Sequence, residues 1–175
     1  MNRDNYCTPP ALFAVMDDEF CFSIDVAASS ENALCDDFFT EDDDSLTRDW
    51  RSAVWDDWTG HYVWANPPYS DIGPWVRKAA EQAQNGIGCV MLVMADTSVG
   101  WYKKAISTAQ EVRFITGGRI SFISPETGKP AAGNNKGSMF IIWYPYGRGK
   151  LQVSHIDRDD LLAKGREILS KASKP

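Results

Sequence analysis

The sequence predicts an α/β fold in which an open, mostly parallel sheet carries helices on both faces. Segments typical of strands and of helices alternate along the chain, which is the pattern of strand–helix–strand units. Residues 88–95, GCVMLVMA, are apolar without interruption, as expected for a strand covered on both faces of such a sheet. The 175 residues suffice for one domain with a substantial core and leave little chain for a second.

The first part of the chain predicts one helix, one strand and an acidic connection. Residues 8–20 predict a loop and then a short helix, because Leu12 and Met16 fall on one helical face. Residues 22–26 predict a buried strand that breaks into a loop of small residues. Residues 38–50, FFTEDDDSLTRDW, predict a mixture of loop and short helix.

The middle of the chain predicts two further strand–helix pairs. Residues 61–69 predict a strand that ends at two prolines. A helix follows over 73–84, with Pro74 in its first turn, where the missing N–H needs no partner. The apolar strand over 88–95 then leads into a helix over 98–109.

The last third predicts the edge of the sheet and a closing helix. Residues 111–116 predict a strand, and residues 119–124 and 138–145 flank a segment rich in turn residues. We expect these two flanking strands to form a long antiparallel hairpin with a polar, basic tip, which would make the sheet edge antiparallel. Residues 157–172 carry apolar residues at helical spacing and predict a packing helix.

The composition is that of a soluble globular protein, with 43% hydrophobic and 24% charged residues. The first ten residues, MNRDNYCTPP, lack the apolar core of a signal peptide, and no apolar run reaches membrane-spanning length. We therefore expect a cytoplasmic protein. The cysteines form no C-x-x-C pair and the two histidines lie far apart, so we expect reduced thiols and no metal site.

Charge is distributed unevenly along the chain. The net charge of −6 argues against a polyanionic partner. However, residues 1–60 hold 15 Asp and Glu against 3 Lys and Arg, whereas residues 100–150 hold 8 Lys and Arg against 2 Glu. Because local potential steers binding, the basic segment is compatible with a nucleic-acid partner; solvated faces of opposite sign would give the same pattern.

The carboxyl ends of strands in an open α/β sheet are where ligands gather. Three segments, 25–28, 66–69 and 95–97, each follow a predicted strand, so we expect them to share one edge. In the second of them, two prolines form a stiff segment that cannot join a strand ladder, and Asn66 before them is held extended. A strand-ending turn would explain the prolines, but not the amide before them and the aromatic ring of Tyr69 after them.

The sequence NPPY at residues 66–69 resembles the signature of methyltransferases that use S-adenosylmethionine to modify exocyclic amino groups, usually N6 of adenine in DNA. Protein-glutamine methyltransferases carry the same signature. Over roughly residues 6–145 the chain resembles, in order, the phage-type DNA N6-adenine methyltransferase (Dam) family. The segments that carry this resemblance are CTPPALF, DVAAS with NALC, FFTEDDDSLTRDW, WANPPYS, VMADTSVGW and GRISF.

This resemblance implies a Rossmann-like methyltransferase fold in a single domain over residues 1–175, with a motif-bearing core over about 6–145 and a C-terminal helix over about 157–172. The implied cofactor is S-adenosylmethionine, and the implied partner is double-stranded DNA in a bacterial or phage-infected bacterial cell. The reaction needs no metal.

The resemblance also implies roles for residues 66–69. Asn66 Oδ1 and the Pro67 carbonyl would accept hydrogen bonds from N6 of an adenine flipped out of the duplex. Pro68 would complete the rigid segment, and Tyr69 would stack on the base.

For the cofactor, the resemblance implies that Thr8 and Pro9 contact the methionine end. Asp25 would face the amino group, with Ala27 in the same loop, and Asp44 with Ser45 would hold the adenosine end. Many methyltransferases have a Gly-rich loop after the first strand, whereas this chain has DVAASSEN, which contains no glycine.

Candidate DNA contacts gather after the catalytic segment and in the basic part of the chain: Ser70, Arg119, Asn134, Asn135 and Lys136. Asn can bond adenine bidentately and Lys can bond guanine or phosphate, although hairpin tips are also commonly polar without a function. Trp50, Trp55 and Trp58 are predicted to serve packing.

Two alternatives to a DNA adenine methyltransferase remain at the level of sequence. One is a protein-glutamine N5 methyltransferase, against which stand the basic segment and the lack of the N-terminal helical domain that is usual in that family. The other is a catalytically silent nucleic-acid-binding module, against which stands the intact NPPY.

Overall fold

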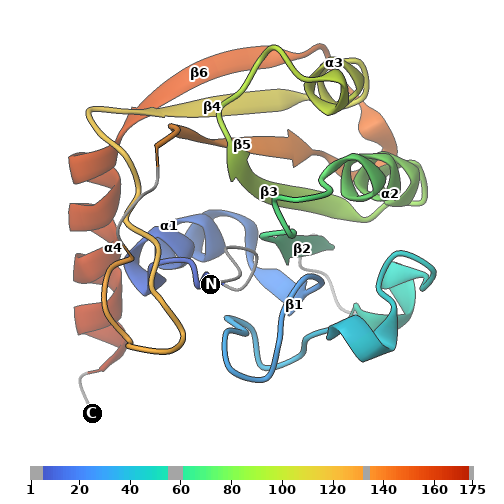
Figure 1. The fold of residues 1–175 in the computed structure, drawn as a ribbon. Coiled ribbons are helices and arrows are strands. Elements are labelled where there is room, and N and C mark those ends of the chain that lie inside the picture. The colour runs from blue at the N-terminus through green and yellow to red at the C-terminus, as the bar shows by residue number, and fades with distance from the viewer. Residues whose placement is uncertain (1–5, 55–60, 132–134, 174–175) are drawn as a thin grey trace.

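The protein forms one six-stranded sheet with strand order β1-β2-β3-β5-β4-β6 (Figure 1). The computed structural model describes residues 6–54, 61–131 and 135–173. The strands are β1 (Phe22–Asp25), β2 (Tyr62–Ala65), β3 (Gly88–Met94), β4 (Glu111–Thr116), β5 (Ser138–Trp143) and β6 (Gln152–Asp157). The helices are α1 (Pro10–Phe20), α2 (Gly73–Gln84), α3 (Gly100–Ile106) and α4 (Arg158–Ala172), with short 3-10 turns η2 (Glu41–Asp43), η3 (Trp50–Ala53) and η4 (Pro145–Gly147).

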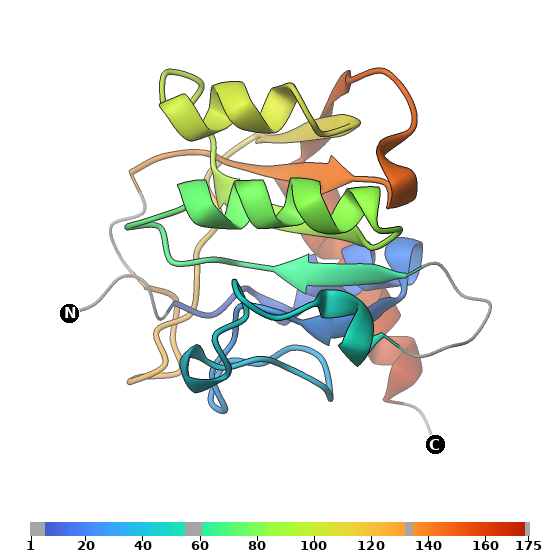
Figure 2. The same cartoon turned by 90° about the vertical axis from the view of Figure 1, so that its right-hand side faces the viewer.

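The sheet is mixed and mostly parallel, as predicted. β1, β2 and β3 run parallel to one another, and β6 runs parallel to β4. β5 is antiparallel to both of its neighbours, β3 and β4, so its arrowhead points opposite to that of β2 (Figure 2).

The antiparallel hairpin is present, but its position differs from the prediction. Its first strand is β4, and the segment over 119–124 forms only isolated bridges, in which Ile123 pairs with Cys7 and with Pro130. β5 also lies inside the sheet, because β3 occupies its other side. The strand at this edge of the sheet is β6, which runs parallel to β4 and was not predicted.

Helices cover both faces of the sheet, so two apolar layers enclose it (Figure 1). Val76 and Ala79 of α2 pack with Met91 and Ile141 on one face. On the other face, α1 and α4 enclose a layer that includes Leu12, Leu161, Trp64 and Phe140. α4 crosses α1 so closely that a Cβ at Gly165 would lie 1.7 Å from the Ala11 carbonyl oxygen, which leaves room only for glycine.

Helix boundaries follow local chemistry. Pro10 and Pro74 stand in the first turns of α1 and α2, where a missing N–H has no cost. The Asp157 carboxylate caps α4 by accepting hydrogen bonds from the amides of Asp159 and Asp160. In the part of the chain that the structure describes, no helix is long and apolar enough to cross a membrane.

Candidate functional site

The three segments predicted to share an edge do so. β1 ends at Asp25, β2 at Ala65 and β3 at Met94, and the three strands are parallel neighbours. The loops that follow them therefore emerge on one side of the sheet. The N-terminal segment joins them there, because the backbone of Cys7 pairs with that of Ile123 through two hydrogen bonds of 2.9 Å.

Asn66 presents a buried hydrogen-bond acceptor at this edge. Its amide nitrogen donates to the carbonyl oxygen of Tyr6 at 3.4 Å, which fixes the orientation of the side chain. Its Oδ1 is buried and has no partner among the described residues. A buried amide oxygen without a donor is costly, so this atom is suited to accept a hydrogen bond from a ligand.

The side chain of Tyr69 is fixed by packing of its ring, because its buried hydroxyl has no hydrogen-bond partner among the described residues. The ring meets that of Phe122 edge-on, with centroids 6.1 Å apart. Burial raises the pKa of Tyr69 well above its ordinary value, so the phenol stays neutral. The loop after β4, which carries Phe122, thus packs directly against the NPPY segment.

A pocket of about 440 Å³ opens beside this segment, a size typical of small-molecule sites. One wall is the loop after β1, the second is the acidic segment 39–46, and the third comes from the start of α2 and the turn before it. The predicted residues that line it are Ala27, Asp44, Ser45, Pro68 and Ser70, joined by others including Asn32, Phe39 and Trp75.

The loop after β1 keeps its shape without glycine. The backbone of Asp25 pairs with residues 37 and 39, and the amide of Ala28 donates to the Phe39 carbonyl at 3.1 Å. Among the described residues, positive φ outside glycine occurs only at Cys21, Asp44 and Tyr146, so no residue of this loop needs glycine's freedom. The left-handed residue of the pocket is Asp44, with φ 50°.

Asp25 lies beneath the pocket rather than in its wall. Its side chain is 3% exposed, and its two carboxylate oxygens accept from the amides of Ala27 at 3.2 Å and Leu34 at 3.4 Å. Burial raises the pKa of Asp25 to about 7, although these two hydrogen bonds lower it.

Thr8 and Pro9 also lie outside the pocket lining. The Thr8 residue is 2% exposed, and its hydroxyl has no hydrogen-bond partner in the described part of the chain. It therefore resembles Asn66 in offering a buried polar atom without a protein partner.

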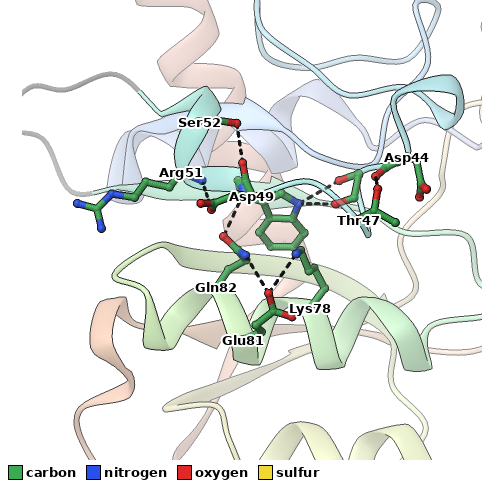
Figure 3. Close-up of polar contacts among 10 residues, drawn as sticks. Asp44, Thr47, Asp49, Arg51, Ser52, Lys78, Glu81 and Gln82 are labelled. Carbon is green, nitrogen blue, oxygen red and sulfur yellow. Dashed lines mark hydrogen bonds and ion pairs between the residues drawn. The ribbon is translucent and has the colours of Figure 1, made fainter.

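Hydrogen bonds link the acidic wall to α2 through Trp50, whose backbone N–H donates to Gln82 of that helix (Figure 3). Trp50 is fully buried, which confirms its predicted packing role, and its indole N–H donates to Ser45. Trp55 and Trp58 lie outside the described residues.

The predicted DNA contacts fall into different environments. Lys136 is exposed, but its ammonium pairs with Asp96 at the end of β3. The hydrogen bond from Lys136 lowers the pKa of Asp96 to about 2. Arg119 and Asn135 are exposed on the connection between β4 and β5. Ser70 is exposed beside the pocket. Asn134 lies outside the described residues.

Sequence reasoning missed part of the pocket wall. Phe39 and Trp75 line the pocket, and the position of Trp75 in the first turn of α2, just after NPPY, was the available signal. No comparable signal in the sequence marked Phe39.

Comparison with known proteins shows which family and which relatives the chain resembles. Residues 1–168 match the model of the family described as DNA N-6-adenine-methyltransferase (Dam). The chain is 34% identical over 168 residues to the DNA N-6-adenine-methyltransferase of Escherichia phage T1, covering 87% of this chain and 68% of that protein. It is 32% identical over 168 residues to the enzyme of the same name from Haemophilus phage HP1, covering 94% of this chain and 92% of that protein.

Among solved structures, the chain is similar to a predicted O-methyltransferase from Agrobacterium tumefaciens. The TM-score is 0.47 with 16% identity, over 90% of this chain and 95% of that one.

The buried carboxyl of Asp25 predicts a pH dependence of stability. Its pKa is about 7 in the folded protein and near 4 when unfolded, so between these values the folded state binds more protons. Its contribution to stability therefore falls as the pH rises from about 4 through about 7. We expect Asp25→Asn to lack this fall.

Unfolding of wild type and Asp25→Asn by urea at about pH 5 and about pH 8 checks this. The wild type should lose stability relative to Asp25→Asn at the higher pH. Parallel pH profiles of the two proteins would contradict it.

Proposed function

The chain belongs to the DNA N-6-adenine-methyltransferase (Dam) family, and from this premise we propose that Asn66, Pro67, Pro68 and Tyr69 form its catalytic site. The enzyme transfers a methyl group from S-adenosylmethionine to N6 of adenine in DNA. The observation that carries the proposed site is the buried Oδ1 of Asn66, which has no partner among the described residues and lies at the strand end beside the pocket.

The chemistry explains why an acceptor belongs there. The N6 lone pair of adenine is delocalised into the ring, so the amino group is planar and a poor nucleophile. Asn66 Oδ1 and the Pro67 carbonyl would accept hydrogen bonds from the two N6 hydrogens and draw the nitrogen toward tetrahedral geometry. Positive charge develops on that nitrogen, and oxygen dipoles already in place stabilise it without reorganisation.

The chain fixes these dipoles in advance. Pro67 is buried and Pro68 lies at the pocket, and neither has an N–H that could pull the segment back into the sheet. The Tyr6 carbonyl holds the Asn66 amide nitrogen, which leaves Oδ1 as the free end. The arrangement supports a role in catalysis, because only donors or acceptors held in place act at the moment charge develops.

We assign the base-stacking role to Tyr69. An adenine whose N6 is paired in a duplex is out of reach, so the base must flip out, at a cost of a few kcal/mol. A ring that stacks on it returns about 1–3 kcal/mol. The edge-on contact with Phe122 orients the Tyr69 ring for this.

We place the cofactor in the pocket between the loop after β1 and the acidic wall. S-adenosylmethionine, when bound, supplies an electrophilic methyl group. Ser45 Oγ accepts from Trp50, so its own hydrogen remains for an acceptor in the pocket. The carboxyl group of Asp25, beneath the loop, would attract the ammonium group of the cofactor. Asp44 and Ala27 would line the adenosine side of the pocket. Thr8, whose hydroxyl has no partner among the described residues, and Pro9 would approach from the N-terminal segment.

We further propose that the target is double-stranded DNA, approached from the side of the loop between β4 and β5. Arg119, Lys129 and Asn135 are exposed on this loop, and Phe122 of the same loop touches Tyr69. Ser70 would contact the DNA next to the flipped base. We propose a single methyltransferase domain over residues 1–175 that acts in the cytoplasm of a bacterial or phage-infected cell without a metal.

Asn66→Ala should lower kcat by about 10²–10³-fold, because a transition-state acceptor is lost, while the Kd for S-adenosylmethionine stays unchanged. Methylation kinetics and calorimetry check this, with Asn85→Ala, an exposed residue just after α2, as the control. Wild-type turnover by Asn66→Ala would show that the assignment is wrong.

Tyr69→Phe should keep near-normal kcat/KM, because the lost hydroxyl has no partner in the described structure. Tyr69→Ala should weaken binding of target DNA by about 1–3 kcal/mol through lost stacking. Fluorescence of 2-aminopurine at the target position reports flipping and should rise for wild type and Tyr69→Phe only. Equal, severe losses in both variants would implicate the hydroxyl instead.

Lys129→Ala should reduce the slope of log K against log salt concentration for DNA binding by about one unit, the effect of one phosphate contact. Lys150→Ala is the matched control, since it is also exposed but stands before β6, at the amino ends of β4 and β6 and not at the carboxyl end of β4, where the loop of Lys129 begins. Identical slopes in both variants would place DNA elsewhere.

A further inference from the structure

Trp50 connects the acidic wall of the pocket to helix α2. Its indole N–H donates to both the carbonyl oxygen and the hydroxyl of Ser45, each at 3.0 Å. Its backbone N–H donates to Oε1 of Gln82 at 3.1 Å. Trp50 is 0% exposed and Gln82 1%, so these bonds form out of contact with water.

The α2 side of this connection is itself fixed. Nε2 of Gln82 donates to Glu81 Oε1 at 3.3 Å, and the ammonium of Lys78 reaches the same oxygen at 3.2 Å. The Lys78 side chain is only 8% exposed, whereas that of Glu81 is 61% exposed. The Gln82 amide therefore has one end held by Glu81 and the other end turned toward Trp50.

The same helix also carries the catalytic side of the pocket. α2 begins at Gly73, four residues after Tyr69, and its Trp75 lines the pocket together with Ser45. One rigid helix thus joins the segment that holds Asn66 to the residue that fixes Ser45. Trp50 and Gln82 thus link the acidic wall to the helix that follows the NPPY segment.

We infer that Trp50 is a positioning residue for the cofactor, and that Gln82 acts through it. This inference rests on the proposed placement of S-adenosylmethionine in the pocket. The indole N–H donates to both the carbonyl and the hydroxyl oxygen of Ser45, which holds the side chain in place and leaves its hydroxyl hydrogen for the ligand. Without it, two buried oxygens lose their donor, and Ser45 is free to turn away.

Trp50→Phe tests this, because it keeps an aromatic ring in the core and removes the N–H. The matched control is Trp143→Phe. Trp143 is also fully buried, and its indole donates to Thr108 Oγ1 at 3.0 Å. It pairs with Cys89 near the start of β3, at the end of the sheet away from the pocket.

Both variants should lower the melting temperature by similar amounts. Calorimetry with S-adenosylmethionine should show a Kd about tenfold higher for Trp50→Phe, the effect of one lost buried hydrogen bond. The Kd of Trp143→Phe should stay within about twofold of wild type, because its lost bond is remote. Equal Kd values in the two variants would reduce Trp50 to a structural residue and overturn the inference.

Ser45→Ala provides a second readout. It should weaken cofactor binding in the wild-type background and have little further effect in Trp50→Phe, since the two residues act as one unit. Additive losses would contradict the inference. Should Trp50→Phe fail to fold, Gln82→Met decides instead: it keeps side-chain volume, removes the acceptor for Trp50, and is expected to raise the same Kd several-fold. Wild-type affinity in Gln82→Met would overturn the inference.

Failure of the proposed function looks different. If the wild-type protein did not bind S-adenosylmethionine, the proposed function itself would fail. If Ser45→Ala and Asp44→Ala both bound it normally, the cofactor would lie outside this pocket. Binding by wild type and by Trp50→Phe with equal affinity would refute only the positioning role.

Discussion

The inability of Pro67 and Pro68 to donate a backbone hydrogen bond is the constraint on which the site depends. β2 stops at Ala65, although its neighbour β3 continues beyond the paired Met91 to Met94, because the next residues of β2 cannot extend the ladder. The chain therefore leaves the sheet with Asn66 extended, and its amide meets the Tyr6 carbonyl instead of a strand. α2 begins at Gly73, with Pro74 in its first turn. The segment between β2 and α2 is therefore short and has proline near both of its ends. The Tyr69 ring, the Asn66 amide and the Pro68 side of the pocket all take their positions from this turn.

Burial has different consequences for two polar groups at this edge, Asn66 and Asp25. The Asn66 amide is neutral, so leaving its Oδ1 unpaired costs one hydrogen bond and keeps an acceptor ready. Asp25 is ionisable, and burial disfavours its charge, which the two loop amides only partly offset. A cationic ligand nearby would restore the charged form, so cofactor binding and ionisation of Asp25 are expected to support each other. The same carboxylate shapes the glycine-free loop by holding the amides of Ala27 and Leu34.

The sequence predicted the elements that carry a clear hydrophobic pattern or a proline signal. It missed the features that depend on contacts with residues distant in the chain. Helix 73–84 and strand 111–116 have the predicted bounds, because proline and apolar spacing mark them locally. β6 was missed since an edge strand with mostly exposed side chains carries no burial pattern. Residues 119–124 have the pattern of a strand and were expected to pair with β5. However, β3 and β4 already pair with both sides of β5, so these residues cannot join it. In the site, NPPY was visible in sequence, whereas the contacts of Lys136 with Asp96 and of Trp50 with Gln82 join residues 40 and 32 positions apart.

The uneven charge of the chain takes on a spatial meaning in this fold. The acidic segment lies in the pocket wall, where Glu41 and Asp44 stand beside the proposed cofactor site. S-adenosylmethionine carries a sulfonium and an ammonium, so an acidic rim attracts it and repels phosphate. The exposed Arg119 and Lys129 lie on the loop that reaches Tyr69 from the other side, where the opposite sign favours a DNA backbone. With both ligands in their proposed places, an acidic protein holds a cation and a polyanion at one strand edge, because the NPPY turn lies between the acidic wall and the basic loop and each ligand approaches it from its own side.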